Sequence, residues 1–122
     1  MSRRDDERLG DIVASADAIA AHLQRGSLDD GLVFDAVRVR LIEIGEAVKE
    51  IDQQLLAAEP EIPWRDAARM RDHLAHRYFD TAHGIVQATV DHDLPALVAA
   101  VHRIRTRLRA SGPPPDEPTQ RA

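Results

Sequence analysis

The chain has 122 residues, of which 43% are hydrophobic, so its length and apolar content fit one ordinary folded domain. It contains no cysteine, which excludes disulfide bonds, thiolate metal sites and cysteine nucleophiles. The formal net charge of −5 argues against a surface that coats nucleic acid indiscriminately. No apolar run reaches the roughly eighteen residues of a membrane span, so we expect a cytoplasmic protein without a membrane partner.

Apolar residues recur at helical spacing near the N-terminus, at Leu9, Ile12, Val13, Ala16, Ile19 and Leu23. They predict a first helix of about five turns that ends near Gly26. A second run keeps this period after the capping candidates Ser27, Asp29 and Asp30, at Val33, Val37, Leu41, Ile44, Val48 and Ile51. We expect the two helices to form an antiparallel pair.

The segment 59–64, Glu-Pro-Glu-Ile-Pro-Trp, contains two prolines and is predicted to be a rigid connector. Beyond it, the pattern predicts a helix over about 65–79. Asp80 and Thr81 then offer a cap for a shorter helix to about Val90.

Asp93, followed by Leu94 and Pro95, is a start signal for the last helix. No segment alternates as a strand does. We therefore expect an all-α fold, an up-and-down bundle of four to five helices over residues 1–110. Residues 111–122 are rich in proline and polar side chains, which predicts a disordered tail.

The segment 69–80, Arg-Met-Arg-Asp-His-Leu-Ala-His-Arg-Tyr-Phe-Asp, concentrates the polar chemistry of the chain. At ~100° per residue, Arg71 and Tyr78 fall on nearly the same helix face, whereas His76 lies ~140° from Arg71. For Arg71 and His76 to work together, either the helix deforms near His76 or two chains assemble the site. Asp72 and His76 are stacked four residues apart, and a carboxylate in that place can fix the imidazole tautomer.

The other polar residues of this helix have a plainer interpretation. Arg69, His73 and Arg77 are typical of a solvated helix face. His73 and His76 lie three residues apart, but no third ligand has a suitable spacing, so we expect no metal and no cofactor. Earlier in the chain, Glu46 is a candidate supporting residue on the second helix, although an ordinary surface acid is the commoner case.

The segment from Arg71 to Tyr78 matches the signature R-x-x-x-x-H-x-Y and resembles the HEPN-domain toxins (the HepT family) of bacterial HEPN/MNT (type VII) toxin-antitoxin modules. Three further stretches look like motifs of that family. They are the I-G-E-A stretch at 44–47, the P-x-I-P-W turn at 60–64, and the x-M-R-N approach at 69–72. The resemblance covers roughly residues 8–108, and Asp72 stands where the family usually has Asn.

The resemblance implies a helical bundle that forms a homodimer and cuts RNA without metal in a shared cleft. It implies that His76 is the general acid/base and that Arg71 stabilises the phosphoryl charge. It further implies a partner, an MNT-type nucleotidyltransferase antitoxin, which silences the toxin by transferring AMP to Tyr78.

Asp72 is the main departure from the family pattern, because its carboxylate could orient His76 or repel the RNA phosphate. A rival interpretation is a non-catalytic HEPN-like module that binds a nucleotidyltransferase partner or a nucleotide. The net charge of −5 and the scarcity of aromatic residues favour that rival slightly. The complete set of Arg71, His76 and Tyr78 favours the ribonuclease more.

Overall fold

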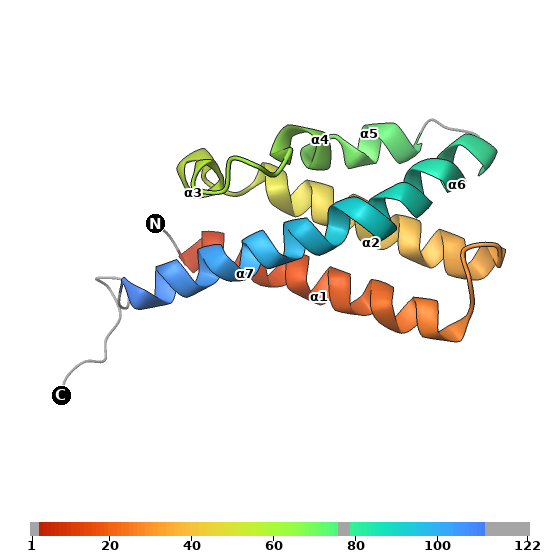
Figure 1. Ribbon diagram of the computed structural model, residues 1–122, viewed down its shortest axis with the longest axis horizontal. Helices are drawn as coiled ribbons and strands as arrows, with labels where there is room; N and C mark the ends of the chain where they lie inside the picture. Colours follow the sequence, from red (N-terminus) through yellow and green to blue (C-terminus); the bar gives the residue numbers. More distant parts are fainter. Residues whose placement is uncertain (1–2, 76–78, 112–122) are drawn as a thin grey trace.

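The computed structural model describes residues 3–75 and 79–111, and every regular element within these ranges is helical (Figure 1). This confirms the all-α prediction. Residues 76–78 and the predicted tail beyond 111 lie outside the described residues. In the described part of the chain, no helix has the length and apolar character that a membrane span requires.

The first two helices form the predicted antiparallel pair, α1 (Arg3–Arg25) and α2 (Gly31–Lys49) (Figure 1). Of the cap candidates, Asp30 caps α2 by accepting a 2.9 Å hydrogen bond from the Leu32 backbone N–H. The first helix is longer than predicted. Its first turns are held in place because the Asp5 carboxylate accepts a hydrogen bond from the Asp52 backbone N–H, at 3.1 Å.

A short helix that the sequence did not predict, α3 (Gln53–Ala57), follows α2. Asp52 caps it through a 2.8 Å bond from the Gln54 N–H. The connector that leads to α4 (Trp64–Ala68) is non-helical, as the prolines predicted. Trp64 closes this turn, because its indole Nε1–H donates to the Glu59 carbonyl at 3.0 Å.

The prediction of one uninterrupted helix over 65–79 is wrong, because the helix breaks at Arg69 and α5 (Met70–Ala75) begins after it. The break lies where Gly45 of α2 meets this segment. A Cβ atom on Gly45 would lie only 2.7 Å from the Ala67 carbonyl oxygen and 3.2 Å from Met70 Cβ. Only glycine lets α2 approach the break this closely, so tertiary contact accompanies the departure from a regular helix.

The last part of the chain is a continuous helical rod made of α6 (Phe79–Ala88), the π-helical turn η1 (Thr89–Asp93) and α7 (Leu94–Ala110). The predicted start of the last helix is confirmed, because α7 begins at Leu94 with Pro95 in its first turn, but the Asp93 side chain makes no capping bond. Instead, the Leu94 N–H bonds the Thr89 carbonyl five residues back. This wide turn immediately precedes Pro95, which cannot donate to the usual partner four residues back.

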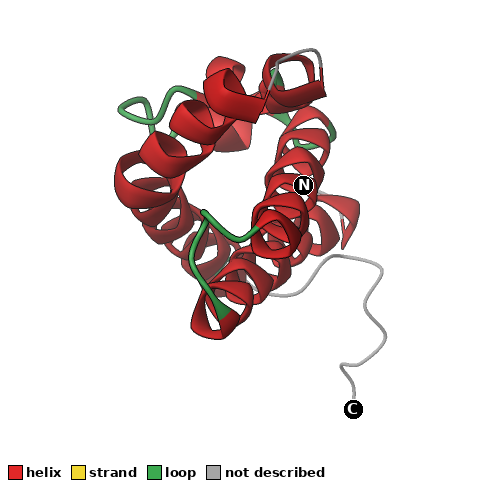
Figure 2. Cartoon of the chain, turned by 90° about the vertical axis from the view of Figure 1, so that its right-hand side faces the viewer, coloured by secondary structure: helices red, strands yellow, loops and turns green. Residues whose placement is uncertain are grey.

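Together the helices form four rods, α1, α2, the broken rod α4 to α5, and the rod from α6 to α7 (Figure 1). Seen along their length, they surround a common axis (Figure 2). The core between them is apolar, and its fully buried members include Leu9, Ile12, Leu41, Leu74, Val86 and Val101. This arrangement confirms the bundle of four to five helices, whereas dimerisation stays a prediction.

Candidate active site

The helix α5 presents the first residues of the R-x-x-x-x-H-x-Y motif to solvent. Its inner side is anchored by Leu74, which is fully buried, and by Met70, which packs against the core. Arg71 and Asp72 lie between these anchors in sequence and are exposed. Met70 and Leu74 turn one side of α5 to the core, which leaves Asp72 on the opposite side and Arg71 ~80° from the buried direction, where it is available to a ligand.

Arg71 forms no ion pair or hydrogen bond to another side chain among residues 3–75 and 79–111. Within the same ranges, Asp72 has none either. An unpaired guanidinium can bind an incoming phosphate with its full hydrogen-bonding fork. The exposed position and free charge of Arg71 suit the role that the motif implies.

His76 and Tyr78 lie outside the described residues, as does Arg77. The predicted stacking of Asp72 with His76 and the shared face of Arg71 and Tyr78 therefore stay predictions. Of the neighbours assigned to the solvated face, Arg69 is exposed and His73 is partly buried.

Sequence reasoning missed a second arginine near this segment, Arg38 of α2. Its Nη1 donates to the Leu74 carbonyl oxygen at 3.3 Å, in the last turn of α5. Arg38 directly follows the core residue Val37 in the α2 pattern, and nothing in that pattern distinguishes it from an ordinary helix-surface base. Only the packing of α5 against α2 brings it to the motif.

Charge pairing separates two groups of arginine and lysine residues, Arg3 apart, in the described chain. The paired group bridges elements or neighbouring turns, with the ion pairs Arg4–Glu50, Arg8–Asp11, Arg40–Glu43, Lys49–Glu46, Arg103–Glu59, Arg105–Asp6 and Arg107–Glu59. The group without a carboxylate partner in the described ranges comprises Arg25, Arg38, Arg65, Arg69, Arg71 and Arg109. Arg25 and Arg109 lie at helix C-termini, where they complement the helix dipole. Of the other four, Arg38 lies on α2, Arg65 on α4, Arg69 at the break between α4 and α5, and Arg71 on α5.

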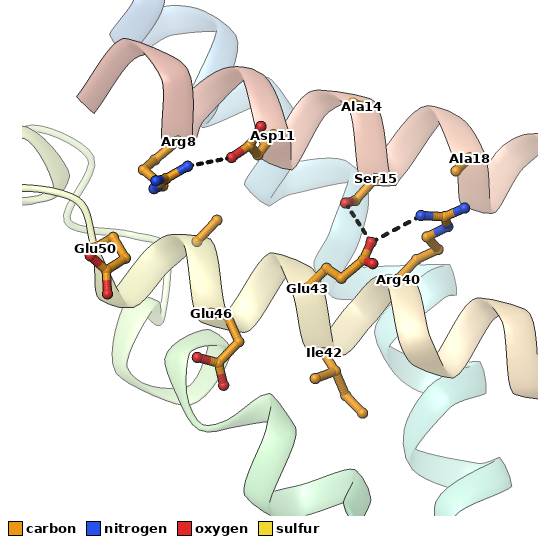
Figure 3. A pocket seen from close by; sticks show the side chains of 11 residues that line it. Arg8, Asp11, Ala14, Ser15, Ala18, Arg40, Ile42, Glu43, Glu46 and Glu50 are labelled. Atoms are coloured by element: carbon orange, nitrogen blue, oxygen red, sulfur yellow. Dashed lines mark hydrogen bonds and ion pairs between the residues drawn. The ribbon is translucent and has the colours of Figure 1, made fainter. Parts of the chain in front are cut away.

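Glu46 lies at an open hollow of about 720 Å³ between α1 and α2 (Figure 3). Its carboxylate is 3.7 Å from Lys49 Nζ, and Figure 3 shows it turned away from α1. Glu43, by contrast, turns toward α1 and accepts hydrogen bonds from Ser15 at 3.3 Å and Arg40 at 3.1 Å. A supporting role for Glu46 stays a prediction, because no described contact joins it to Arg71.

Carboxylates and imidazoles of the described residues do not gather into a metal-binding cluster. No group of three or more His, Asp or Glu side chains in ranges 3–75 and 79–111 has suitable geometry.

The amino-acid sequence is similar to that of proteins named as ribonucleases. The profile of the family described as "Ribonuclease HepT-like" matches residues 9–104. A protein of Thermococcus cleftensis named "Probable ribonuclease HepT" is 34% identical over 109 residues, which are 86% of this chain and 99% of the relative. A Methanocaldococcus jannaschii protein named "Gamma-glutamylcyclotransferase and putative RNase" is 31% identical over 104 residues, 82% of this chain and 47% of the relative. No solved structure gives a significant match.

Proposed function

Because the chain belongs to the HepT-like ribonuclease family, we propose that it is an endoribonuclease of the HEPN type. We further propose that it is the toxin of a HEPN/MNT toxin-antitoxin module and that it cuts RNA without a metal. The observation that carries the proposal is Arg71, an exposed arginine without a carboxylate partner in the described chain, in register with the R-x-x-x-x-H-x-Y motif.

The proposed reaction uses two side chains of the motif. His76 removes the proton from a ribose 2′-hydroxyl, whose oxygen attacks the adjacent phosphorus. The bond from phosphorus to the 5′-oxygen breaks, and an imidazolium returns a proton to that oxygen. Arg71 stabilises the negative charge that grows on the non-bridging phosphoryl oxygens, for which a planar guanidinium is well suited.

A homodimer would explain how Arg71 and His76 can act on the same phosphate. On a regular helix, Arg71 and His76 point ~140° apart, so one chain alone directs them to different places. Two chains packed about a twofold axis can place Arg71 of one beside His76 of the other. Asp72, four residues before His76, would orient the imidazole in the same cleft.

Tyr78 has a regulatory role in this proposal. Its phenolic oxygen attacks the α-phosphorus of ATP bound to an MNT-type nucleotidyltransferase antitoxin, and pyrophosphate leaves. The attached AMP adds bulk and phosphate charge beside Arg71, which excludes RNA. Tyr78 is the only tyrosine of the chain, so a single modification site is expected.

The test is cleavage of RNA by the purified chain in EDTA, with His76→Ala compared with the control His73→Ala on the same segment. Loss of a general acid/base should lower the rate by about 10²-fold or more, whereas His73→Ala should stay close to the unsubstituted protein. Incubation with ATP, magnesium and the neighbouring nucleotidyltransferase should add one or more AMP masses at Tyr78 and stop cleavage. Tyr78→Phe should resist that modification.

Equal cleavage by His76→Ala and the unsubstituted chain would contradict the proposed mechanism. Binding of RNA or of the nucleotidyltransferase without any cleavage would favour the rival, a non-catalytic binding module. The observation on its side is the net charge of −5, since a ribonuclease gains from a basic field.

A further inference from the structure

Arg38 is placed unusually for an arginine of a packed helix. It is only partly exposed, and its Nε–H is buried without a hydrogen-bond partner. Its single described hydrogen bond runs from Nη1 to the Leu74 carbonyl oxygen at 3.3 Å. Among the side chains that the structure describes, no carboxylate pairs with it. A partly buried charged group without a counter-ion destabilises the folded state, so a functional reason for its position has to be considered.

Arg40, two residues further along α2, shows the ordinary arrangement. Its guanidinium pairs with Glu43 at 3.1 Å and also contacts His22 Nε2 at 3.4 Å. The same helix therefore carries one neutralised arginine, which faces α1, and one arginine with no counter-ion among the described side chains, which faces α5. The difference leaves a positive charge at the end of the motif helix.

The place of Leu74 on α5 fixes where this charge lies relative to the motif. Leu74 is in the last turn of α5, three residues after Arg71. The bond to the Leu74 carbonyl thus holds the guanidinium of Arg38 at the end of α5, one helical turn from Arg71.

We propose that Arg38 is a second phosphate-binding residue of the RNA-cleavage site. A guanidinium has five N–H groups, and the bond to Leu74 uses one of them. The exposed Nη hydrogens remain for a non-bridging oxygen of an RNA phosphate, while the carbonyl anchor keeps the group oriented before the substrate arrives. This inference rests on the proposed ribonuclease function and adds a residue to the same site.

The experiment measures binding of a fully 2′-O-methylated RNA oligonucleotide, which lacks the attacking hydroxyl, over a series of salt concentrations. Cleavage of the unmodified RNA is measured in parallel. The variants are Arg38→Gln, Arg38→Lys and the control Arg109→Gln. Arg109 is also unpaired in the described chain, but it lies in the last turn of α7, at the end of the bundle away from α5 (Figure 1).

Arg38→Gln should weaken RNA binding about 5-fold to 10-fold and reduce the slope of log K against log salt by ~0.7, the value for one phosphate contact with a single strand. Arg38→Lys keeps the charge, so its slope should stay unchanged while cleavage slows. Arg109→Gln should match the unsubstituted protein. If Arg38→Gln does not fold, as judged by circular dichroism, Arg38→Met replaces it, because Met keeps an apolar stem without the charge and should show the same reduced slope.

Unchanged binding and slope in Arg38→Gln, with slower cleavage, would overturn the proposal and make Arg38 a structural support of α5. An equal effect of Arg109→Gln would also overturn it, because the effect would then be one of general charge. A reduced slope in Arg38→Lys would contradict it as well. Failure of the unsubstituted chain to bind and cleave RNA would instead reject the proposed function, and this inference with it.

Discussion

The two ends of the bundle use arginine in opposite ways. At the end where α7 finishes, Glu59 is buried between Arg103 and Arg107, with N to O distances of 2.7 and 2.8 Å, and Arg105 lies 3.4 Å from Asp6. At the end where α5 finishes, Arg38 of α2 contacts the Leu74 carbonyl and has no carboxylate partner among the described side chains. Arg71, one turn before Leu74 on α5, has none there either. The first set of arginines joins distant segments of the chain through ion pairs, whereas the charges of the second set can bind a phosphate.

This difference separates stability from function within one small domain. The hydrogen bonds from Arg103, followed by those from Arg107, lower the pKa of Glu59 against the opposing effect of burial. The contact with Glu59 likewise raises the pKa of Arg103. The motif end is held by packing instead, through Leu74 and the close approach of Gly45. Substitutions of the charged side chains at the two ends should therefore affect different measurements.

The largest effect is expected for Arg71→Ala at the motif end. Loss of a charge-stabilising group should lower kcat/KM for RNA cleavage about 10²-fold to 10³-fold. The midpoint of denaturant unfolding should barely move, because Arg71 is exposed and makes no described side-chain contact. Arg71→Lys should recover only part of the rate, since an ammonium lacks the planar fork. A large loss of stability in Arg71→Ala would contradict the proposal that the arginines at the motif end serve function and those at the other end serve stability.

Next in size is Gly45→Ala, which tests whether packing holds the motif helix. The added Cβ would meet the Ala67 carbonyl at 2.7 Å, so α2 and α4 must move apart, at a cost of about 1–3 kcal/mol in unfolding free energy. Gly84→Ala is the matched control, because nothing lies within 4 Å of its added Cβ and alanine favours the helix by about 0.5–1 kcal/mol. Urea unfolding measures both. Equal stability of the two variants would show that the contact at Gly45 is not tight.

The smallest effect is expected for Glu59→Gln at the paired end, with the exposed neighbour Glu61→Gln as control. Glu59→Gln should lower Tm near pH 7 by a few degrees and leave cleavage at 25 °C unchanged. The folded-state pKa of Glu59 lies below its ordinary value of 4.5, so its stabilisation is present above that value and is lost as the pH falls through the folded pKa. The Tm difference from the unsubstituted protein should therefore shrink on acidification. A constant difference would rule out ionisation of Glu59 as the cause.

Periodicity was sufficient to predict the rods of the bundle, because the apolar positions of α1, α2 and α7 recur over many turns. It could not predict α3, whose five residues are too few to establish a period. The break at Arg69 also escaped, since it goes with a contact to Gly45 more than twenty residues away in sequence. Apolar periodicity describes each helix in isolation, whereas the break at Arg69 depends on residues that are distant in sequence.

The candidate site divides in the same way. Arg71 could be selected from the sequence because it belongs to the R-x-x-x-x-H-x-Y motif, and the structure adds that it is exposed. Arg38 was invisible to the same reasoning, because its relevance depends on where α5 packs against α2. Motifs within one segment identify residues that act together along the chain, but residues contributed by another helix appear only once the fold is known.

The π-helical turn at Thr89–Asp93 sets the phase between the two halves of the last rod. One residue rotates an α-helix by ~100°, so the wide turn absorbs an offset of about that size between α6 and α7. Deleting a single residue there would convert the rod into a regular helix and keep Leu97, Val101 and Ile104 facing the core, because the wide turn holds one residue more than an α-helix of the same rotation. Frame-preserving loss of one codon in this turn should thus be far less damaging than the same loss within α6 or α7, which would rotate the stripe by ~100°.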